Sequence, residues 1–189
     1  ARSFLADKNP AKRKELIESL LRREEFVAFW ALKWSDLLRI KGENPVNLWP
    51  KGAEAYYQWA YESVARNKPY DQIARELLTA TGSNFRCGPS NFYRAVPSRD
   101  PRTYGESAAL VFLGARLLCA RCHGHPEEAW GQDDNLGMAA FFGQIRLKVT
   151  DEWKEQIVYR DPGVVMRDPR TGGPVPPRPL GGAPMEIPP

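Results

Sequence analysis

Apolar residues recur in the first part of this chain at spacings of three and four, the period of an amphipathic helix. Asn9-Pro10 has the composition of a helix start. It is followed by two apolar stripes: Leu16, Ile17, Leu20 and Leu21, then Phe26, Trp30, Trp34, Leu37 and Leu38. This pattern predicts two short helices, or one bent helix, over about residues 10–40.

The middle of the chain shows the same helical period twice more. A third helix is predicted over residues 53–66 and ends at Lys68-Pro69. Pro69 can begin a fourth helix that runs through Leu78. Residues 81–101 are rich in glycine and proline, and we expect an irregular loop there.

The next apolar run leads directly into a group of cysteines and histidines. Thr103 and Glu106 have the spacing of a capping box. The residues after them are almost all apolar, so they predict a central buried helix that ends at Cys119. A last helix is expected from Asp133 to Leu147.

The C-terminal part has a different composition. Residues 154–160 predict a short strand, and Val164–Met166 a second, joined by Asp161-Pro162-Gly163. Nine prolines between Asp161 and Pro189 favour an extended, stiff tail. The predicted fold is therefore mainly α, a helical domain with irregular loops over 1–153, followed by a short hairpin and a proline-rich extended tail or linker over 154–189.

The overall composition narrows the possible classes of protein. The chain has 189 residues and a net charge of +4, with acidic and basic residues interleaved rather than gathered on one stretch, which argues against a nucleic-acid binder. It has no run of 18 apolar residues, so no membrane-spanning segment is expected. Three cysteines do not indicate a disulfide framework. Since Ala1-Arg2-Ser3-Phe4 has neither a start methionine nor a signal core, we expect a processed product or a fragment.

Candidate chemistry is concentrated in Cys119-Ala120-Arg121-Cys122-His123. Cys-x-x-Cys-His is the attachment motif of a c-type haem. Two thiols three residues apart can reach the two vinyl groups of one porphyrin, and the adjacent histidine can supply a ring nitrogen to the iron. The motif predicts one covalently bound haem c, with Cys119 and Cys122 as the links and His123 as an iron ligand.

Three other interpretations of this cluster stay open. Cys119, Cys122, His123 and His125 have the ligand types of a zinc or iron site, although structural zinc sites normally pair two knuckles separated by a longer loop. The two cysteines could instead form a dithiol redox pair, or the spacing could be a coincidence.

The second iron ligand has several candidates. Met138 lies on the predicted last helix, and it could equally be an ordinary core residue. Met166 and Met185 lie in the proline-rich tail. His125 is too close to His123 to reach the opposite face of the same haem, so a contact with a propionate, proton donation or a ligand role toward another chain is more natural. A five-coordinate iron is also open.

Other residues near the motif could form the haem pocket. Aromatic side chains could form its walls, and arginines could pair with the propionates, although a plain core or surface role fits each of them as well. These candidates are Trp130, Phe141 and Phe142 for the walls and Arg116 and Arg121 for the propionates. Cys87, alone in a loop, has no assigned role.

Several blocks of sequence resemble one known family. They are Phe4-Leu5-Ala6-Asp7, Trp30 to Leu38, Asn91 to Arg94, Arg99-Asp100-Pro101, Phe112-Leu113-Gly114, Cys119 to Pro126, Trp130, Gln132 to Asp134, Gly137 to Phe142, Pro169 to Gly172, Pro176 to Arg178 and Leu180 to Gly182. Together they are similar to the cytochrome-c-type domain of large exported planctomycete proteins, a domain of unknown function. The resemblance covers nearly the whole chain.

This resemblance implies an exported, haem-binding, mainly helical domain, often part of a longer polypeptide. It assigns the haem-linking roles to Cys119, Cys122 and His123, and His125 also falls in the family's pattern. Met138 stands where relatives carry another apolar residue, which counts against a general role as the distal ligand.

The expected function is electron transfer between this haem and a redox partner protein or neighbouring domains, in the periplasm or an equivalent exported compartment. Alternatives are the haem module of a redox enzyme of the peroxidase or oxidase kind with an open distal site, a docking module, and a Cys/His zinc-binding structural module.

Overall fold

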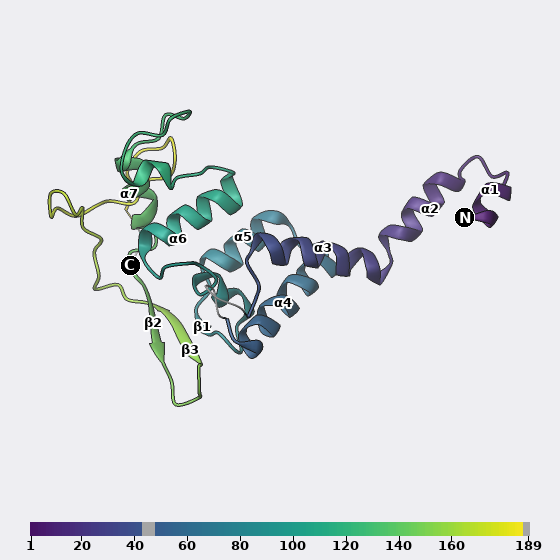
Figure 1. Cartoon of the computed structure of the whole chain (residues 1–189), viewed down its shortest axis with the longest axis horizontal. Coiled ribbons are helices and arrows are strands. Elements are labelled where there is room, and N and C mark those ends of the chain that lie inside the picture. Colours follow the sequence, from purple (N-terminus) through teal and green to yellow (C-terminus); the bar gives the residue numbers. More distant parts are fainter. Residues whose placement is uncertain (43–47, 187–189) are drawn as a thin grey trace.

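The computed structural model describes residues 1–42 and 48–186. Figure 1 shows a body of packed helices with a small sheet, and an arm formed by the first two helices that extends away from it. The seven α-helices are α1 (Arg2–Ala6), α2 (Lys12–Leu21), α3 (Glu24–Leu37), α4 (Pro50–Ala65), α5 (Tyr70–Leu78), α6 (Pro101–Ala108) and α7 (Gln132–Ala140), as far as the described residues show. Shorter turns are η1 (Gly88–Tyr93), η2 (Ala109–Leu113) and η3 (Cys119–Arg121), and the strands are β1 (Gly82–Ser83), β2 (Ile145–Val149) and β3 (Gln156–Arg160).

The sheet corrects the predicted fold class. Its three strands are antiparallel in the order β1-β3-β2, and the structure is 47% helical, so the fold is mixed α/β and the prediction of a mainly α fold is wrong. The predicted last helix ends at Ala140 rather than Leu147. Ile145, Leu147 and Val149 alternate with basic residues at the period of a strand, and pairing with β3 determines their conformation.

The C-terminal segment also differs from the prediction. β3 lies within the stretch predicted as a strand, but it pairs with β1 and β2, and residues 164–166 form no regular strand. The predicted extended tail is not observed, because the segment folds back and Arg178 N–H donates to the carbonyl of Gly137 on α7 at 3.0 Å. β3 thus shares a sheet with strands from before residue 153, and the division of the chain at that residue stays a prediction.

The main core lies between the helices and the sheet. Tyr93 is fully buried and packs edge-on against Tyr104, with ring centroids 5.1 Å apart, and Phe142 closes the group at 6.2 Å from Tyr93. Aliphatic and aromatic residues from α4, α5 and β3 complete it: Tyr56, Ile73, Leu77 and Val158. Burial of these side chains provides the main stabilisation of the body.

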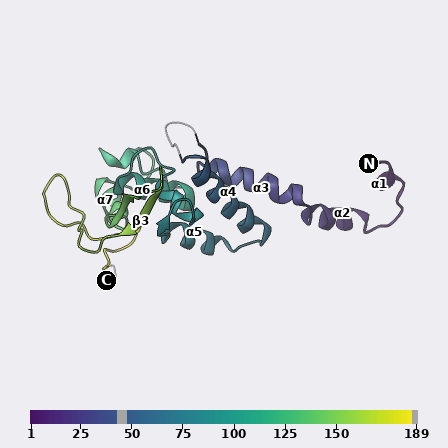
Figure 2. The same cartoon turned by 90° about the horizontal axis from the view of Figure 1, so that it is seen from below.

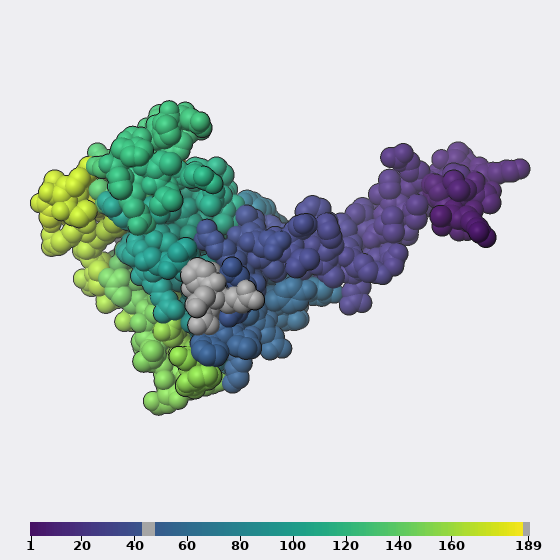
Figure 3. Space-filling model, viewed as in Figure 1, coloured from purple at the N-terminus to yellow at the C-terminus, as the bar shows by residue number. Residues whose placement is uncertain are grey.

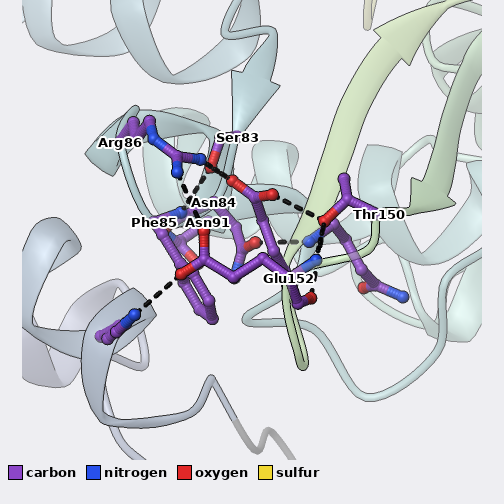
Figure 4. A network of polar contacts seen from close by, with 10 residues as sticks. Ser83, Asn84, Phe85, Arg86, Asn91, Thr150 and Glu152 are labelled. Carbon is purple, nitrogen blue, oxygen red and sulfur yellow. Dashed lines mark hydrogen bonds and ion pairs between the residues drawn. The ribbon is translucent and has the colours of Figure 1, made fainter.

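A polar network fastens the sheet to the helices. The carboxylate of Glu155 accepts hydrogen bonds from Ser83 on β1 and from Thr150 in the turn between β2 and β3. These bonds hold the pKa of Glu155 below its usual value. The neighbouring Glu152 accepts from Arg86 at 2.9 Å and from Lys51 on α4 at 2.7 Å. Figure 4 shows Glu152 beside Arg86. The network therefore joins β1, the hairpin and α4.

The arm is helical but contributes nothing to the core. Neither α1 nor α2 has a buried residue. The apolar stripe of α2 (Leu16, Ile17, Leu20 and Leu21) is 39–48% exposed, and the arm stands apart from the body in two perpendicular views (Figures 1 and 2). Within the described residues no helix has the length and apolarity needed to cross a membrane.

The segment before the motif is less regular than predicted. α6 begins at Pro101, where the Asp100 side chain caps it by accepting from Thr103 N–H at 3.1 Å, so Thr103 is not the cap. The predicted central helix up to Cys119 is wrong. Instead, α6 passes into the π-helical turn η2, and the helical backbone stops at Gly114. The φ of Gly114 is 67°, in the left-handed region that favours glycine. Leu113, just before this break, and Leu118, beyond it, are both about 60% exposed.

Candidate functional site

The Cys-x-x-Cys-His motif lies on the short turn η3. Ala120, between the cysteines, is fully buried and packs with Ala109 and Leu117. Cys119 is half-buried and Cys122 is exposed, and both thiols are free. The buried alanine thus anchors the turn and leaves the thiols on the accessible side. Figure 3 shows the segment around residues 120–130 as a green projection at one end of the body.

Arg121 fixes the turn to α6. Its Nε and Nη2 donate to the two carboxylate oxygens of Glu106 at 2.8 and 2.9 Å, and Nη2 also donates to the Thr103 hydroxyl at 3.1 Å. The paired carboxylate raises the pKa of Arg121. A fork of this kind sets both position and orientation. Arg121 is therefore directed toward α6 rather than free for a propionate.

Glu106 extends this anchor to α7. Its Oε1 accepts from Asn135 Nδ2 at 2.8 Å, and the same amide nitrogen donates to the Leu117 carbonyl at 3.2 Å. The Glu106 side chain is only 11% exposed, so the bonds are partly shielded from water. Thr103 and Glu106, predicted as a capping box, instead hold the motif turn in place.

The imidazole of His123 has a defined tautomer. Its Nδ1 lies 2.6 Å from the carbonyl oxygen of Gly124. A carbonyl oxygen only accepts, so Nδ1 carries the proton and the neutral ring presents the Nε2 lone pair. Metal-binding histidines are commonly oriented by such a bond from their other ring nitrogen. The ring of His123 is exposed, and Nε2 makes no hydrogen bond within the described residues.

His125 has the opposite arrangement. Its Nδ1 accepts from the backbone N–H groups of Glu127 and Glu128 at 3.2 and 3.1 Å. Nδ1 therefore carries the lone pair, and in the neutral ring the proton is on Nε2. The backbone N–H of His125 donates to the Trp130 carbonyl at 2.8 Å and closes the loop. His125 organises this loop, and a ligand role through either nitrogen would require new hydrogen bonding there.

An open cavity of about 660 Å³ lies beside His123. On one side Gln132 donates from Nε2 to the Cys122 carbonyl. Four of the ten lining residues are charged, and both arginines come from the C-terminal segment. The lining residues are Cys122, His123, Gly124, Ala129, Gly131, Gln132, Asp133, Asp134, Arg170 and Arg178.

The candidate pocket residues separate into two groups. Trp130 packs against the small cluster of Ala109, Leu117 and Ala120 next to the motif, and Met138 packs against both this cluster and the main core. Phe142 is buried in the main core beside Tyr93, with Phe141 packed on the same core. The structure therefore brings Trp130 to the motif and places the two phenylalanines away from it.

The remaining candidates are dispersed. Met166 lies against Gly143, beyond the end of α7. Met185 is about half exposed, and its N–H donates to the Pro177 carbonyl at 2.8 Å. Cys87 precedes η1 and is half-buried, and Arg116 is exposed. Over residues 1–42 and 48–186, no three His, Cys, Asp or Glu side chains are grouped so that they could hold a metal ion.

The structure adds residues that the motif does not reveal. Glu106 and Asn135 anchor the turn, and Gln132, Arg170 and Arg178 reach the cavity. The last two lie far along the chain in a segment predicted to be an extended tail. Gln132, Arg170 and Arg178 lie in blocks that resemble the family, but the resemblance assigned no role to them.

The donor set fits the covalent attachment of a haem c. Two free thiols are held on an accessible turn, and the adjacent imidazole offers Nε2. A porphyrin is a wide apolar ring, and Leu113 and Leu118 on the same segment are exposed apolar side chains that such a ring could cover.

The fold and the motif define a small mixed α/β domain with a Cys-x-x-Cys-His turn beside an open cavity. The family model PSCyt2, described as a protein of unknown function (DUF1549), matches residues 1–147, and the chain belongs to this family. The matched range contains the motif and ends within β2, ahead of β3 and the C-terminal segment. No curated protein and no solved structure matches the chain.

Proposed function

We propose that this domain carries one covalently attached haem c, linked through Cys119 and Cys122 with His123 as an iron ligand, and that it transfers electrons to and from a partner protein or neighbouring domain. The observation that carries the proposal is the hydrogen bond between His123 Nδ1 and the Gly124 carbonyl. It leaves the Nε2 lone pair for a metal, directly after the second cysteine of the attachment motif.

The chain's own residues have defined tasks in this proposal. The haem supplies one-electron chemistry at its iron. Arg121 and Glu106 hold the attachment turn on α6, and Gln132 fixes the Cys122 carbonyl. The Gly124 carbonyl orients the His123 ring. Each bond limits motion of a group that would touch the cofactor, and a rigid site lowers the reorganisation that accompanies electron transfer.

The compartment and the partner follow from the proposed cofactor. The resemblance implies an exported domain, and we propose a periplasmic or equivalent location in which another redox protein or domain meets the exposed motif. The accessible position of Cys122 and His123 favours such an encounter.

A second candidate is the haem module of a redox enzyme with an open distal site. It is favoured by the composition of the cavity, whose lining among the described residues combines charged and polar side chains with glycine and alanine and includes no methionine. A cavity without a thioether leaves room for a small exogenous ligand. Binding of cyanide to the ferric protein would distinguish this candidate from a low-spin iron with two protein ligands.

The test is the visible spectrum of the full chain produced in a host that attaches haem to Cys-x-x-Cys-His motifs. The ferric and dithionite-reduced spectra and the pyridine haemochrome are recorded before and after acid-acetone extraction. We expect colour that stays with the protein, and the colour to become extractable or to be lost in Cys119→Ser with Cys122→Ser. Cys87→Ser is the matched control and should keep the covalent haem.

His123→Ala tests the ligand separately from the attachment. Covalent haem with an altered ferric spectrum is the expected result. A colourless wild-type chain from a competent host would overturn the proposal, and zinc analysis of that chain would then test the Cys/His metal module.

A further inference from the structure

The C-terminal segment from Asp161 to Glu186 supplies part of the cavity beside His123. It contributes Arg170 and Arg178 to the lining, although it lies outside residues 1–147 that the family model matches.

Arg170 is connected to the motif by two hydrogen bonds. Its Nη1 donates to Gln132 Oε1 at 2.9 Å, and Gln132 Nε2 donates to the Cys122 carbonyl. Since the amide of Gln132 accepts at its oxygen and donates at its nitrogen, the bond from Arg170 determines which way this amide faces. The carbonyl that it holds belongs to the peptide between Cys122 and His123.

Carboxylates on two segments hold the guanidinium of Arg170. Asp168, with a side chain 13% exposed, accepts from Nη2 at 2.7 Å and from Nε at 3.0 Å, and Asp133 on α7 accepts from Nη2 at 2.6 Å. All three nitrogens therefore have partners in one fixed arrangement. A lysine ammonium at this position could not satisfy the three partners at once.

A second contact keeps the segment on α7. Arg178 donates to Asp134 at 2.9 Å, and its N–H donates to the Gly137 carbonyl at 3.0 Å. A Cβ on Gly137 would lie 2.7 Å from the Arg178 Cβ, so the close approach depends on the glycine. Arg170 is therefore delivered by a segment that is fixed next to it.

We propose that Arg170 is a positioning residue for the candidate haem site and acts through Gln132 on the Cys122–His123 peptide. This inference rests on the proposed function for its effect on a haem. Its structural part, the ordering of the motif turn by a segment outside the family match, can be measured with or without a cofactor.

The experiment compares variants of the full chain in two states. Arg170→Ala removes the guanidinium group, and Arg170→Lys keeps the positive charge alone. Gln132→Glu keeps the side-chain acceptor for Arg170 but loses the donor to the Cys122 carbonyl. Arg167→Ala is the matched control, because among the described residues the Arg167 side chain donates within its own segment, to the Gly172 carbonyl at 2.9 Å. Covalent haem content, ferric spectrum and reduction potential are measured in haem-loaded protein, and thiol-reagent rates at Cys119 are measured in haem-free protein.

We expect Arg170→Ala and Gln132→Glu to retain covalent haem, to change the ferric spectrum and to lower the reduction potential, since each makes the site less positive and less ordered. Arg170→Lys should recover the potential only in part, and Arg167→Ala should match the wild type. In haem-free protein the half-buried Cys119 should react several-fold faster with the thiol reagent in Arg170→Ala and Gln132→Glu than in the wild type.

Two results would overturn the inference: spectra, potential and Cys119 rate in Arg170→Ala equal to those of Arg167→Ala, or full recovery by lysine, which would leave a role for charge alone. A colourless wild type would be a failure of the proposed function and not of this inference, because an increase in the Cys119 rate in Arg170→Ala would still support the positioning role.

Discussion

The two ends of the chain differ in a way that secondary structure does not reveal. The N-terminal arm is regular, with α2 running from Lys12 to Leu21, yet it has no buried residue. The C-terminal segment after β3 has neither an α-helix nor a named strand in its described part, yet it packs on α7 and reaches the motif through Arg170.

The difference lies in how the two segments satisfy their backbone groups. A helix satisfies most of its N–H and C=O groups internally, so α2 needs nothing from the body. An irregular segment must find partners elsewhere, and here it finds the Gly137 carbonyl for Arg178 N–H. In this protein the irregular segment is therefore the one attached to the candidate site, and the helical arm is the one that could be removed without loss to the body.

The largest expected effect is the difference in unfolding free energy between a chain that lacks the C-terminal segment and a chain that lacks the N-terminal arm. Truncation after Gly163 removes the Arg178–Asp134 pair and the packing of Leu180 on the cluster beside the motif, and we expect it to lower the free energy of unfolding by about 2–4 kcal/mol. Deletion of residues 1–22 should change it by no more than about 0.5 kcal/mol. Urea unfolding of both truncated chains measures the difference. Equal losses would show that the arm is as well integrated as the C-terminal segment.

A single substitution should loosen the C-terminal segment alone. Gly137→Ala places a methyl group against Arg178, and overpacking of this kind costs about 1–3 kcal/mol, offset in part by the gain in helix propensity of about 1 kcal/mol. The expected result is faster trypsin cleavage between Arg170 and Thr171. Gly124→Ala is the control, since nothing lies within 4 Å of its added carbon. Unchanged cleavage in Gly137→Ala would mean that the segment is not held by this contact.

The smallest expected effect is a dependence on pH. The Arg170 guanidinium lowers the pKa of Asp168 to about 2 from its usual 3.8. A carboxylate with a lowered folded-state pKa stabilises the fold above its unfolded value, and this contribution is lost as the pH falls from about 4 to about 2. The difference in unfolding free energy between wild type and Asp168→Asn should therefore be constant above pH 4 and shrink below it. A difference that persists at pH 2 would argue against an ionised Asp168 as the cause.

Local sequence patterns predicted much of the helical part correctly. The stripe from Phe26 to Leu38 corresponds to α3, and Pro69 precedes α5 as expected. These features depend on spacing and on proline, which act within a few residues. The sheet depends on contacts between distant segments, and its strand β2 was missed because Ile145 to Leu147 also fit the end of a helix.

The residues of the candidate site also fall into those that local sequence predicts and those that distant contacts bring together. The cysteines and His123 were found because the motif is contiguous, whereas Gln132 and Arg170 are brought to it by the fold. The predicted helix into Cys119 was wrong because a run of apolar residues does not distinguish a buried helix from a turn. Gly114 is the residue at which the backbone departs from a helix.

The pairing of β1 with β3 affects the order in which the molecule can fold. Val158 is paired with Gly82, 76 positions earlier, and closing so long a loop is entropically unfavourable until other contacts shorten it. α6, the motif turn and α7 all lie inside this loop, and their contacts with one another are shorter in sequence. We therefore expect α6, the motif turn and α7 to assemble first and the sheet to close last.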